Sequence, residues 1–287
     1  MRRSPASFAA LLLLACGLAS VSLPAADPVP TAEAGIPHVR ILFLGNSYTA
    51  RNRLPATVGE IMLSSKLLAP HIGSYLQDGH KLDQHATDKD ALALLKQGAD
   101  GQPWDVVVVQ EQSVLSSMAA VNAEARKLMS DGLSKLVAAA REANPNVLVV
   151  DFQIWARHES LWQKQNKEAL FTGQDATQAH ARIRQANANA VGDALKQHPN
   201  ARILISPVGD FWKLTLEAYP ALPLHSDDGT HPDKLGTMLA GLVIAGTIGG
   251  REVIEQSTWL GDLPFSQVAK VKKVLLDHPE VFKNAGK

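Results

Sequence analysis

The stretch ILFLGNSYTARNRLP, residues 41–55, changes from apolar to polar at Gly45-Asn46-Ser47. Its apolar part is too short for a helix, is rich in strand-forming residues and ends at a glycine. This pattern is typical of a buried parallel strand that enters a tight turn. In open parallel sheets, ligands bind just beyond the carboxyl ends of the strands. Ser47 is therefore a candidate functional residue.

Strand-like runs alternate with helical ones along the rest of the chain. The expected strands are residues 39–44, 71–76, 105–110, 146–155 and 201–208. The clearest helical spacings are at 123–143, 180–198, 232–249 and 264–276. Alternating strands and helices imply right-handed crossovers and a parallel sheet covered on both faces. We therefore expect a three-layer α/β/α, flavodoxin-like doubly wound sheet of five parallel strands.

Length and charge limit the class of protein. The chain has 287 residues and is 46% hydrophobic, which is enough for one α/β domain with a large core. We expect that domain to span residues 39–287. Lys plus Arg equal Asp plus Glu at 28 each, so nothing in the charge favours binding to nucleic acid or to an anionic membrane surface. We expect neither partner, and the oligomeric state stays open.

The N-terminal residues indicate export. Arg2 and Arg3 precede an apolar run at 8–15 and then small residues, a pattern that predicts a signal peptide at residues 1–26. The apolar run is too short to remain as a membrane-spanning helix. Residues 27–38 are rich in Pro and Ala and indicate a flexible lead-in. The sequence thus predicts a secreted or periplasmic protein with no membrane insertion of the mature domain.

Cys16 is the only cysteine in the chain. It follows Leu13-Leu14-Ala15, which resembles a bacterial lipoprotein box in which the cysteine is acylated after cleavage. The alternative is cleavage near Ala19 or Ala26, which discards the cysteine. In both cases the folded domain lacks cysteine, so disulfides, thiol catalysis and Cys-ligated metals are excluded.

A second informative stretch is HSDDGTHPDKLG, residues 225–236. Asp228 lies three residues before His231, and a glycine between them favours a tight turn. An acid at this spacing can hold one imidazole nitrogen and leave the other free to take a proton. Such a pair needs a hydroxyl nucleophile from another loop, and Ser47 is predicted at the same end of the sheet. Pro232 is expected to start the following helix.

These residues resemble a known family. Gly45-Asn46-Ser47-Tyr48 and Asp228-x-x-His231 are similar to the first and last conserved blocks of SGNH/GDSL-type hydrolases, with Asn where that name has Asp. The resemblance spans residues 39–249. It implies a serine esterase in which Ser47 attacks, His231 acts as general base and then general acid, and Asp228 orients His231. The order Ser, Asp, His along the chain is compatible with a catalytic triad.

The resemblance also implies three donors to the oxyanion. They are the N–H of Ser47, the N–H of a glycine after the second strand, which corresponds to Gly79, and a side-chain amide after the third strand. A simple turn glycine is the alternative for Gly79. The usual GxND block is absent. Gln110-Glu111-Gln112-Ser113 resembles the Gln-Gly-Glu-Ser version of sialate and carbohydrate acetylesterases, which selects Gln110, whereas counting to the usual Asn position selects Gln112.

The function that the resemblance implies is hydrolysis of acetyl or other short acyl esters, with a small-molecule or carbohydrate ester as substrate. The carbohydrate part rests on analogy with the Gln-type third block and on export. One alternative is a lipase or thioesterase with the same triad, although no long apolar lid segment is visible. Another is a non-catalytic carbohydrate-binding or envelope-assembly protein, which the atypical third block favours.

Two further patterns have plainer explanations. His80, His85 and Asp83 match no common zinc spacing, and a Ser-His-Asp mechanism needs no ion, so we expect neither a metal nor another cofactor. Trp155 and Trp212 could stack on a sugar ring, but packing in the core is the more common role of such residues.

Overall fold

The structure of the chain, a computed structural model, describes residues 35–161 and 172–285. The predicted signal peptide, Cys16 and most of the predicted lead-in lie outside the described residues. The same holds for residues 162–171.

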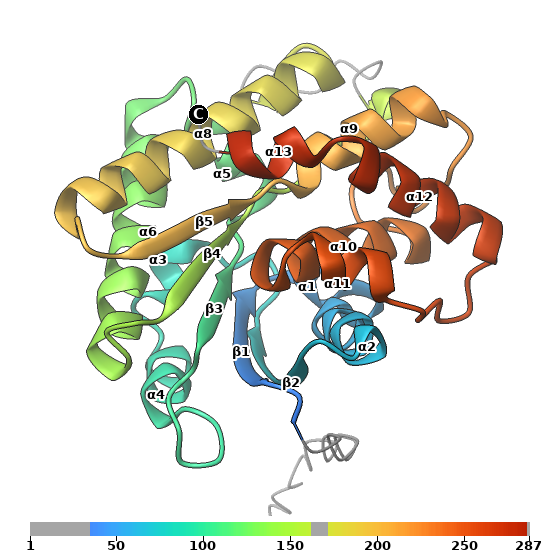
Figure 1. Cartoon of the computed structure of the whole chain (residues 1–287). Helices are drawn as coiled ribbons and strands as arrows, with labels where there is room; N and C mark the ends of the chain where they lie inside the picture. The colour runs from blue at the N-terminus through green and yellow to red at the C-terminus, as the bar shows by residue number, and fades with distance from the viewer. Residues whose placement is uncertain (1–34, 162–171, 286–287) are drawn as a thin grey trace, which may run out of the picture. The chain divides into compact units, whose positions relative to one another are not determined.

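Five parallel strands form one sheet in the order β2-β1-β3-β4-β5 within the described residues (Figure 1). The strands are β1 (His38–Gly45), β2 (Ala69–Leu76), β3 (Val106–Val109), β4 (Leu148–Phe152) and β5 (Arg202–Ser206). Every neighbouring pair is parallel. This order is that of a flavodoxin-like doubly wound sheet, so the predicted fold class is confirmed. The fourth strand is shorter than predicted because its pairing with β5 ends at Phe152 and Ser206.

Helices cover both faces of the sheet (Figure 1). One face packs against α2 (Leu54–Ser65), α9 (Val208–Ala218), α10 (Lys234–Gly249), α11 (Arg251–Gln256) and α12 (Phe265–Asp277). The other packs against α3 (Leu82–His85), α4 (Lys89–Gln97), α5 (Ser113–Met118), α6 (Ala123–Ala143) and α8 (Ala176–Gln197). The remaining elements are short: α1 (Ser47–Ala50), η1 (Arg51–Arg53), η2 (Glu159–Leu161) and α13 (Pro279–Asn284).

The sheet is apolar on both sides because successive side chains of a strand point to opposite faces. Ile41 and Phe43 of β1 join the core under α2 and α10, whereas Leu42 and Leu44 join the core under α3 and α6. This arrangement explains why the strands appear in the sequence as continuous apolar runs. It also places the polar residues that follow each strand at one edge of the sheet.

Side-chain caps set two of the helix boundaries. Asp175 accepts a hydrogen bond from the backbone N–H of Gln178 at 2.7 Å, so α8 begins directly after it. The helix that was predicted to start at Pro232 begins instead at Lys234, because the side chain of Asp233 caps it. Pro232 forms an isolated bridge with His225 and so belongs to the loop.

Candidate active site

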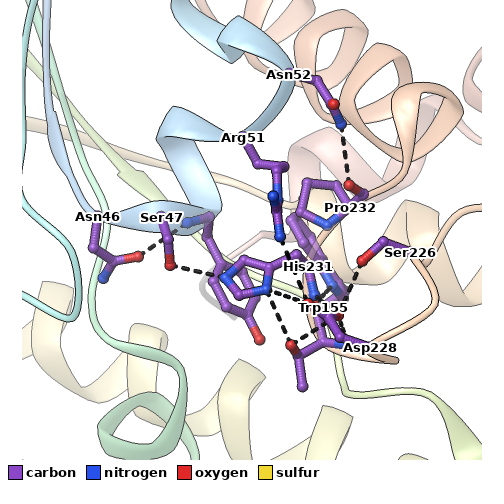
Figure 2. Close-up of polar contacts among 11 residues, drawn as sticks. Asn46, Ser47, Arg51, Asn52, Trp155, Ser226, Asp228, His231 and Pro232 are labelled. Atoms are coloured by element: carbon purple, nitrogen blue, oxygen red, sulfur yellow. Dashed lines mark hydrogen bonds and ion pairs between the residues drawn. The ribbon is translucent and has the colours of Figure 1, made fainter.

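Ser47, His231 and Asp228 converge at the carboxyl end of β1 (Figure 2). The Oγ of Ser47, the first residue of α1, lies 2.9 Å from Nε2 of His231, although the two residues are 184 positions apart. Nδ1 of His231 lies 2.7 Å from Oδ2 of Asp228. The imidazole therefore bridges a hydroxyl and a carboxylate, an arrangement in which Nε2 can take the hydroxyl proton.

Several donors converge on Asp228. Its Oδ1 accepts hydrogen bonds from the backbone N–H groups of Thr230 at 2.8 Å and His231 at 2.9 Å, and from the hydroxyls of Ser226 and Thr230. Partial burial opposes ionisation, but these hydrogen bonds and that of the His231 ring outweigh it and hold the pKa of Asp228 well below its usual range. Nη2 of Arg51 lies 3.7 Å from Oδ2. The carboxylate is thus ionised at neutral pH.

Asn46 shapes the turn that presents Ser47. Its Oδ1 accepts a hydrogen bond from the N–H of Tyr48 at 3.1 Å, which caps α1, and its Nδ2 donates to the carbonyl of His80 at 2.9 Å. The backbone N–H of Asn46 donates to Oε1 of Gln110 at 3.2 Å. One side chain therefore joins the serine turn to the loop after β2.

Gly45 precedes this turn and has no room for a side chain. A Cβ atom there would lie 2.6 Å from Oγ1 of Thr49 and 3.1 Å from Oε1 of Gln110. A larger residue would push both groups away from the turn. The glycine at the end of β1 is thus explained by close packing.

Asn52 joins the serine segment to the loop that carries His231. Its Nδ2 donates to the carbonyl of Pro232 at 3.1 Å (Figure 2). The same Nδ2 also donates to Oγ1 of Thr237 at 3.0 Å. Asn52 and Arg53 both have positive φ angles, of 51° and 58°. Asn tolerates this left-handed conformation better than most residues. The sequence analysis missed Asn52, because its partners lie about 180 positions away.

Three stacked aromatic rings support the imidazole. The ring of Tyr48 lies 5.0 Å from that of Trp155 and 5.2 Å from that of His231. Trp155 in turn stacks on Trp212 at 4.1 Å, and its Nε1 donates to the carbonyl of Thr230 at 3.0 Å. Both tryptophans are buried, as predicted. The sequence analysis did not anticipate that Trp155 would contact the loop that holds His231.

Gly79 occupies a turn at residues 77–80, where the N–H of His80 bonds to the carbonyl of Gln77 at 3.1 Å. Its φ angle is +69°, a conformation that favours glycine. No atom lies within 4 Å of the position that a Cβ would take, so the backbone conformation and not close packing selects glycine. Among the described residues, no hydrogen-bond acceptor engages the N–H of Gly79 or of Ser47.

Both ends of the Gln110 amide are occupied. The side chain is only 1% exposed. Its Oε1 accepts hydrogen bonds from the N–H of Asn46 and, at 2.9 Å, from Oγ1 of Thr49. Its Nε2 donates to the carbonyl of Glu111. Gln110 therefore holds the serine turn, and the second N–H of its amide is buried with the rest of the side chain.

Gln112 has the opposite pattern. Its Oε1 accepts from the N–H groups of Val114 and Leu115, both at 2.9 Å, and so caps α5. Its Nε2 has no hydrogen-bond partner within residues 35–161 and 172–285, and the residue is only half-buried. Of the two candidate glutamines, Gln112 is thus the one whose amide nitrogen has no partner among the described residues and which is not fully buried.

His85, one of the two histidines that follow β2, has a structural role. His85 is fully buried, and its Nε2 donates to the carbonyl of Gly45 at 3.0 Å. In the described part of the chain, no group of three or more His, Cys, Asp or Glu side chains is arranged to hold a metal ion. No helix among these residues is long and apolar enough to span a bilayer.

Known structures share this fold. A DUF4886 family protein from Bacteroides uniformis is 18% identical with a TM-score of 0.62, and the match covers 85% of this chain and 95% of that one. A putative GDSL-like lipase from Parabacteroides merdae is 16% identical with a TM-score of 0.50, covering 75% and 97% of the two chains. A lipase from a goat rumen metagenome is 14% identical with a TM-score of 0.52, covering 75% and 99%.

No known protein-family model matches the sequence, and no curated protein matches it either. At these identities the structural matches establish the architecture of the chain. The chain therefore has the α/β/α fold of the SGNH/GDSL hydrolases.

Proposed function

We propose that the protein is a serine ester hydrolase. The observation that carries this proposal is the unbroken series of hydrogen bonds from the Oγ of Ser47 through His231 to Asp228. A serine hydroxyl becomes a useful nucleophile only when an adjacent base removes its proton. A protein that only binds a ligand has no need of a hydroxyl aligned on an imidazole that is itself held by an ionised carboxylate.

The reaction would proceed in two steps through an acyl-enzyme. Ser47 Oγ attacks the ester carbonyl while its proton moves to Nε2 of His231. When the tetrahedral intermediate collapses, the ester bond breaks and His231 returns the proton to the leaving alcohol. A water molecule, deprotonated by His231, then attacks the acyl-enzyme. Collapse of the second intermediate releases the carboxylic acid and returns the proton to Ser47.

We assign the oxyanion donors to the N–H groups of Ser47 and Gly79 and to Nε2 of Gln112. The unpartnered state of these three groups among the described residues supports this choice. In the alternative donor, Gln110, one of the two Nε2 hydrogens already bonds to the carbonyl of Glu111, and the side chain is buried. Removing one such donor from a serine hydrolase costs about 3–4 kcal/mol of transition-state stabilisation.

For the substrate we propose an acetyl or other short acyl ester on a carbohydrate, by analogy, because glutamine and not asparagine follows the third strand and because the sequence predicts export. The second candidate is a lipase, because two of the matched structures are named as lipases. A series of p-nitrophenyl esters separates the two. Faster turnover of p-nitrophenyl acetate than of esters with longer acyl chains supports the esterase. A preference for acyl chains of eight or more carbons supports the lipase.

A fluorophosphonate probe tests the proposed nucleophile. We expect covalent labelling of the wild type and none of Ser47→Ala. Ser113→Ala is the matched control, because Ser113 is also the first residue of a helix that follows a strand of the same sheet. It should label as the wild type does. Equal labelling of wild type and Ser47→Ala would remove the assignment.

We further propose that the protein acts outside the cytoplasm, because residues 1–26 have the pattern of a signal peptide. Mass spectrometry of the mature N-terminus checks this proposal. A free N-terminus near residue 27 supports soluble export, and a lipid-modified Cys16 supports an anchored protein. An uncleaved Met1 would contradict export.

A further inference from the structure

We propose that Glu111 is a positioning residue that aligns two of the three oxyanion donors, by joining the segment after Gly79 to the backbone of Gln112. This inference rests on the proposed function. Glu111 does not reach the reacting atoms. It would act through the two segments that its carboxyl group holds together.

The contacts of one oxygen carry the inference. Oε1 of Glu111 accepts hydrogen bonds from the N–H of Gln112 at 2.6 Å and from the N–H of Leu82 at 3.3 Å. Leu82 is the first residue of α3, and the turn that contains Gly79 leads directly into it. A single side chain thus connects the loops after β2 and β3, which carry the proposed donors Gly79 and Gln112.

Glu111 has a counterpart in the preceding residue. Oε1 of Gln110 holds the N–H of Asn46 and the hydroxyl of Thr49, and thereby the turn that carries Ser47. Three consecutive side chains therefore have separate tasks. Gln110 fixes the serine turn, Glu111 fixes the other two donor segments, and Gln112 presents its amide.

The buried environment of Glu111 is unfavourable for a carboxyl group, which indicates that this residue has a specific role. The side chain is 1% exposed, and its Oε2 is buried without a hydrogen-bond partner among the described residues. An unsatisfied buried polar atom destabilises the folded state, and an apolar residue of similar size would avoid that cost. An apolar residue could not accept the two N–H groups, and this acceptance is what we infer the site needs.

Glutamine should replace Glu111 well. Burial raises the pKa of Glu111 to about 8, and nearby Asp83 and Asp151 add to the effect, although the N–H groups of Gln112 and Leu82 oppose it. The carboxyl group is then mostly uncharged at pH 7, and its accepting oxygen resembles that of an amide. Glu111→Gln keeps the acceptor, whereas Glu111→Ala removes it.

Asp151 provides a matched control. It lies in β4 at the position next to Val109 of β3, is fully buried, and also has one oxygen without a partner among the described residues. Its other oxygen accepts from Nδ2 of Asn187 at 2.7 Å, on α8. Asp151→Asn therefore alters a similar buried carboxyl group that bonds to neither donor segment.

The experiment compares kcat and KM of the full chain with p-nitrophenyl acetate. For Glu111→Ala we expect kcat to fall by about 10²-fold, as for loss of an oxyanion donor, with KM changed by less than about 3-fold. Glu111→Gln should recover kcat to within about 5-fold of wild type, and Asp151→Asn should stay within about 2-fold. In the double variant Glu111→Ala, Gln112→Ala, the loss of kcat should be markedly smaller than the product of the two single losses. The reason is that Gln112→Ala removes a donor that Glu111→Ala already misaligns.

The outcomes are distinguishable. A wild type that neither turns over the ester nor takes the fluorophosphonate label removes the proposed function, and this role with it. If the wild type is active and Glu111→Ala changes kcat no more than Asp151→Asn does, the inference is overturned and the proposed function stands. If Glu111→Ala does not fold, Glu111→Asp replaces it, since this side chain keeps the carboxyl group but withdraws it by about 1.5 Å. A folded Glu111→Asp with full kcat also overturns the inference.

Discussion

Two regions at the same edge of the sheet hold carboxyl groups in opposite states. In the first, the histidine loop at residues 226–231, the Asp228 side chain is 42% exposed and its pKa is held well below the usual range. In the second, the buried carboxyl pair of Glu111 and Asp151, both side chains are at most 1% exposed. Burial there raises the pKa of Glu111 to about 8 and of Asp151 to about 7.

The difference shows that hydrogen-bond donors and desolvation together determine whether a carboxyl group is ionised. Asp228 is partly covered, yet the donors around both of its oxygens stabilise the anion. Asp151 accepts from Asn187 alone, and this single hydrogen bond is too little to offset full burial. Asp228 is thus ionised beside the imidazole, where the proposed reaction needs a charge. Burial instead favours the uncharged form of Glu111 and Asp151.

The sharpest way to break this comparison is Asp228→Asn. The amide would place an N–H₂ group opposite Nδ1 of His231 and favour the tautomer whose Nε2 already carries a proton. That nitrogen could not accept the proton of Ser47, so we expect kcat for p-nitrophenyl acetate to fall by about 10³–10⁴-fold. Asp227→Asn, one residue earlier and exposed, is the control and should leave kcat unchanged. An Asp228→Asn variant that keeps a tenth of the wild-type kcat would contradict the assignment of Asp228 as the residue that orients His231.

A change at Trp155 tests what holds the histidine loop in place. Trp155→Phe removes the hydrogen bond to the carbonyl of Thr230 and leaves a cavity beside Trp212. We expect the free energy of unfolding, measured in urea, to fall by about 2–4 kcal/mol. Trp259→Phe changes a partly buried tryptophan that is not part of this stack. Its free energy of unfolding should fall by less. Equal losses in the two variants would show that the stack has no special role.

The buried pair predicts a pH dependence of stability. The folded-state pKa of Asp151 lies above the unfolded value of 3.8, so the stability from its protonated form is fully present below about pH 4. This stability is lost as the pH rises through about 7, at up to about 1.4 kcal/mol per pH unit. Asp151→Asn should therefore flatten the decline in unfolding free energy between about pH 4 and 7.

The control for this pH series is Asp131→Asn, which removes an exposed ion pair with Lys127. It should leave the slope as it is in the wild type. A slope that is the same in wild type and Asp151→Asn would mean that Asp151 is ionised in the folded protein. The contrast between the two regions would then be wrong for this residue.

The smallest expected effect is that of Arg51→Gln. The guanidinium is half-exposed and 3.7 Å from Asp228, so solvent and salt screen the interaction. We expect kcat/KM to change by less than about 3-fold at low salt and to match the wild type at 0.5 M NaCl, a concentration at which the Debye length is only about 4 Å. A large effect that persists at high salt would show that Arg51, and not only the donors of the loop, maintains the charge of Asp228.

The sequence by itself determined the elements that depend on local patterns. The apolar run that ends at Gly45 predicted β1 and the serine turn, and the helix expected at 123–143 has those same bounds in the structure. The three-residue spacing of Asp228 and His231 predicted their contact, because both residues lie on one short loop. Local spacing is sufficient in these cases because the interacting groups are close in the chain.

Only the tertiary structure decided how distant groups share their hydrogen bonds. The contact of Ser47 with His231 depends on two segments that Asn52 joins across the fold. Gln110 and Gln112 are the same residue type two positions apart, yet Asn46, Thr49 and the carbonyl of Glu111 occupy the amide of Gln110 alone. Which donor stays free depends on partners from other strands and loops, and no pattern within a single segment carries that information.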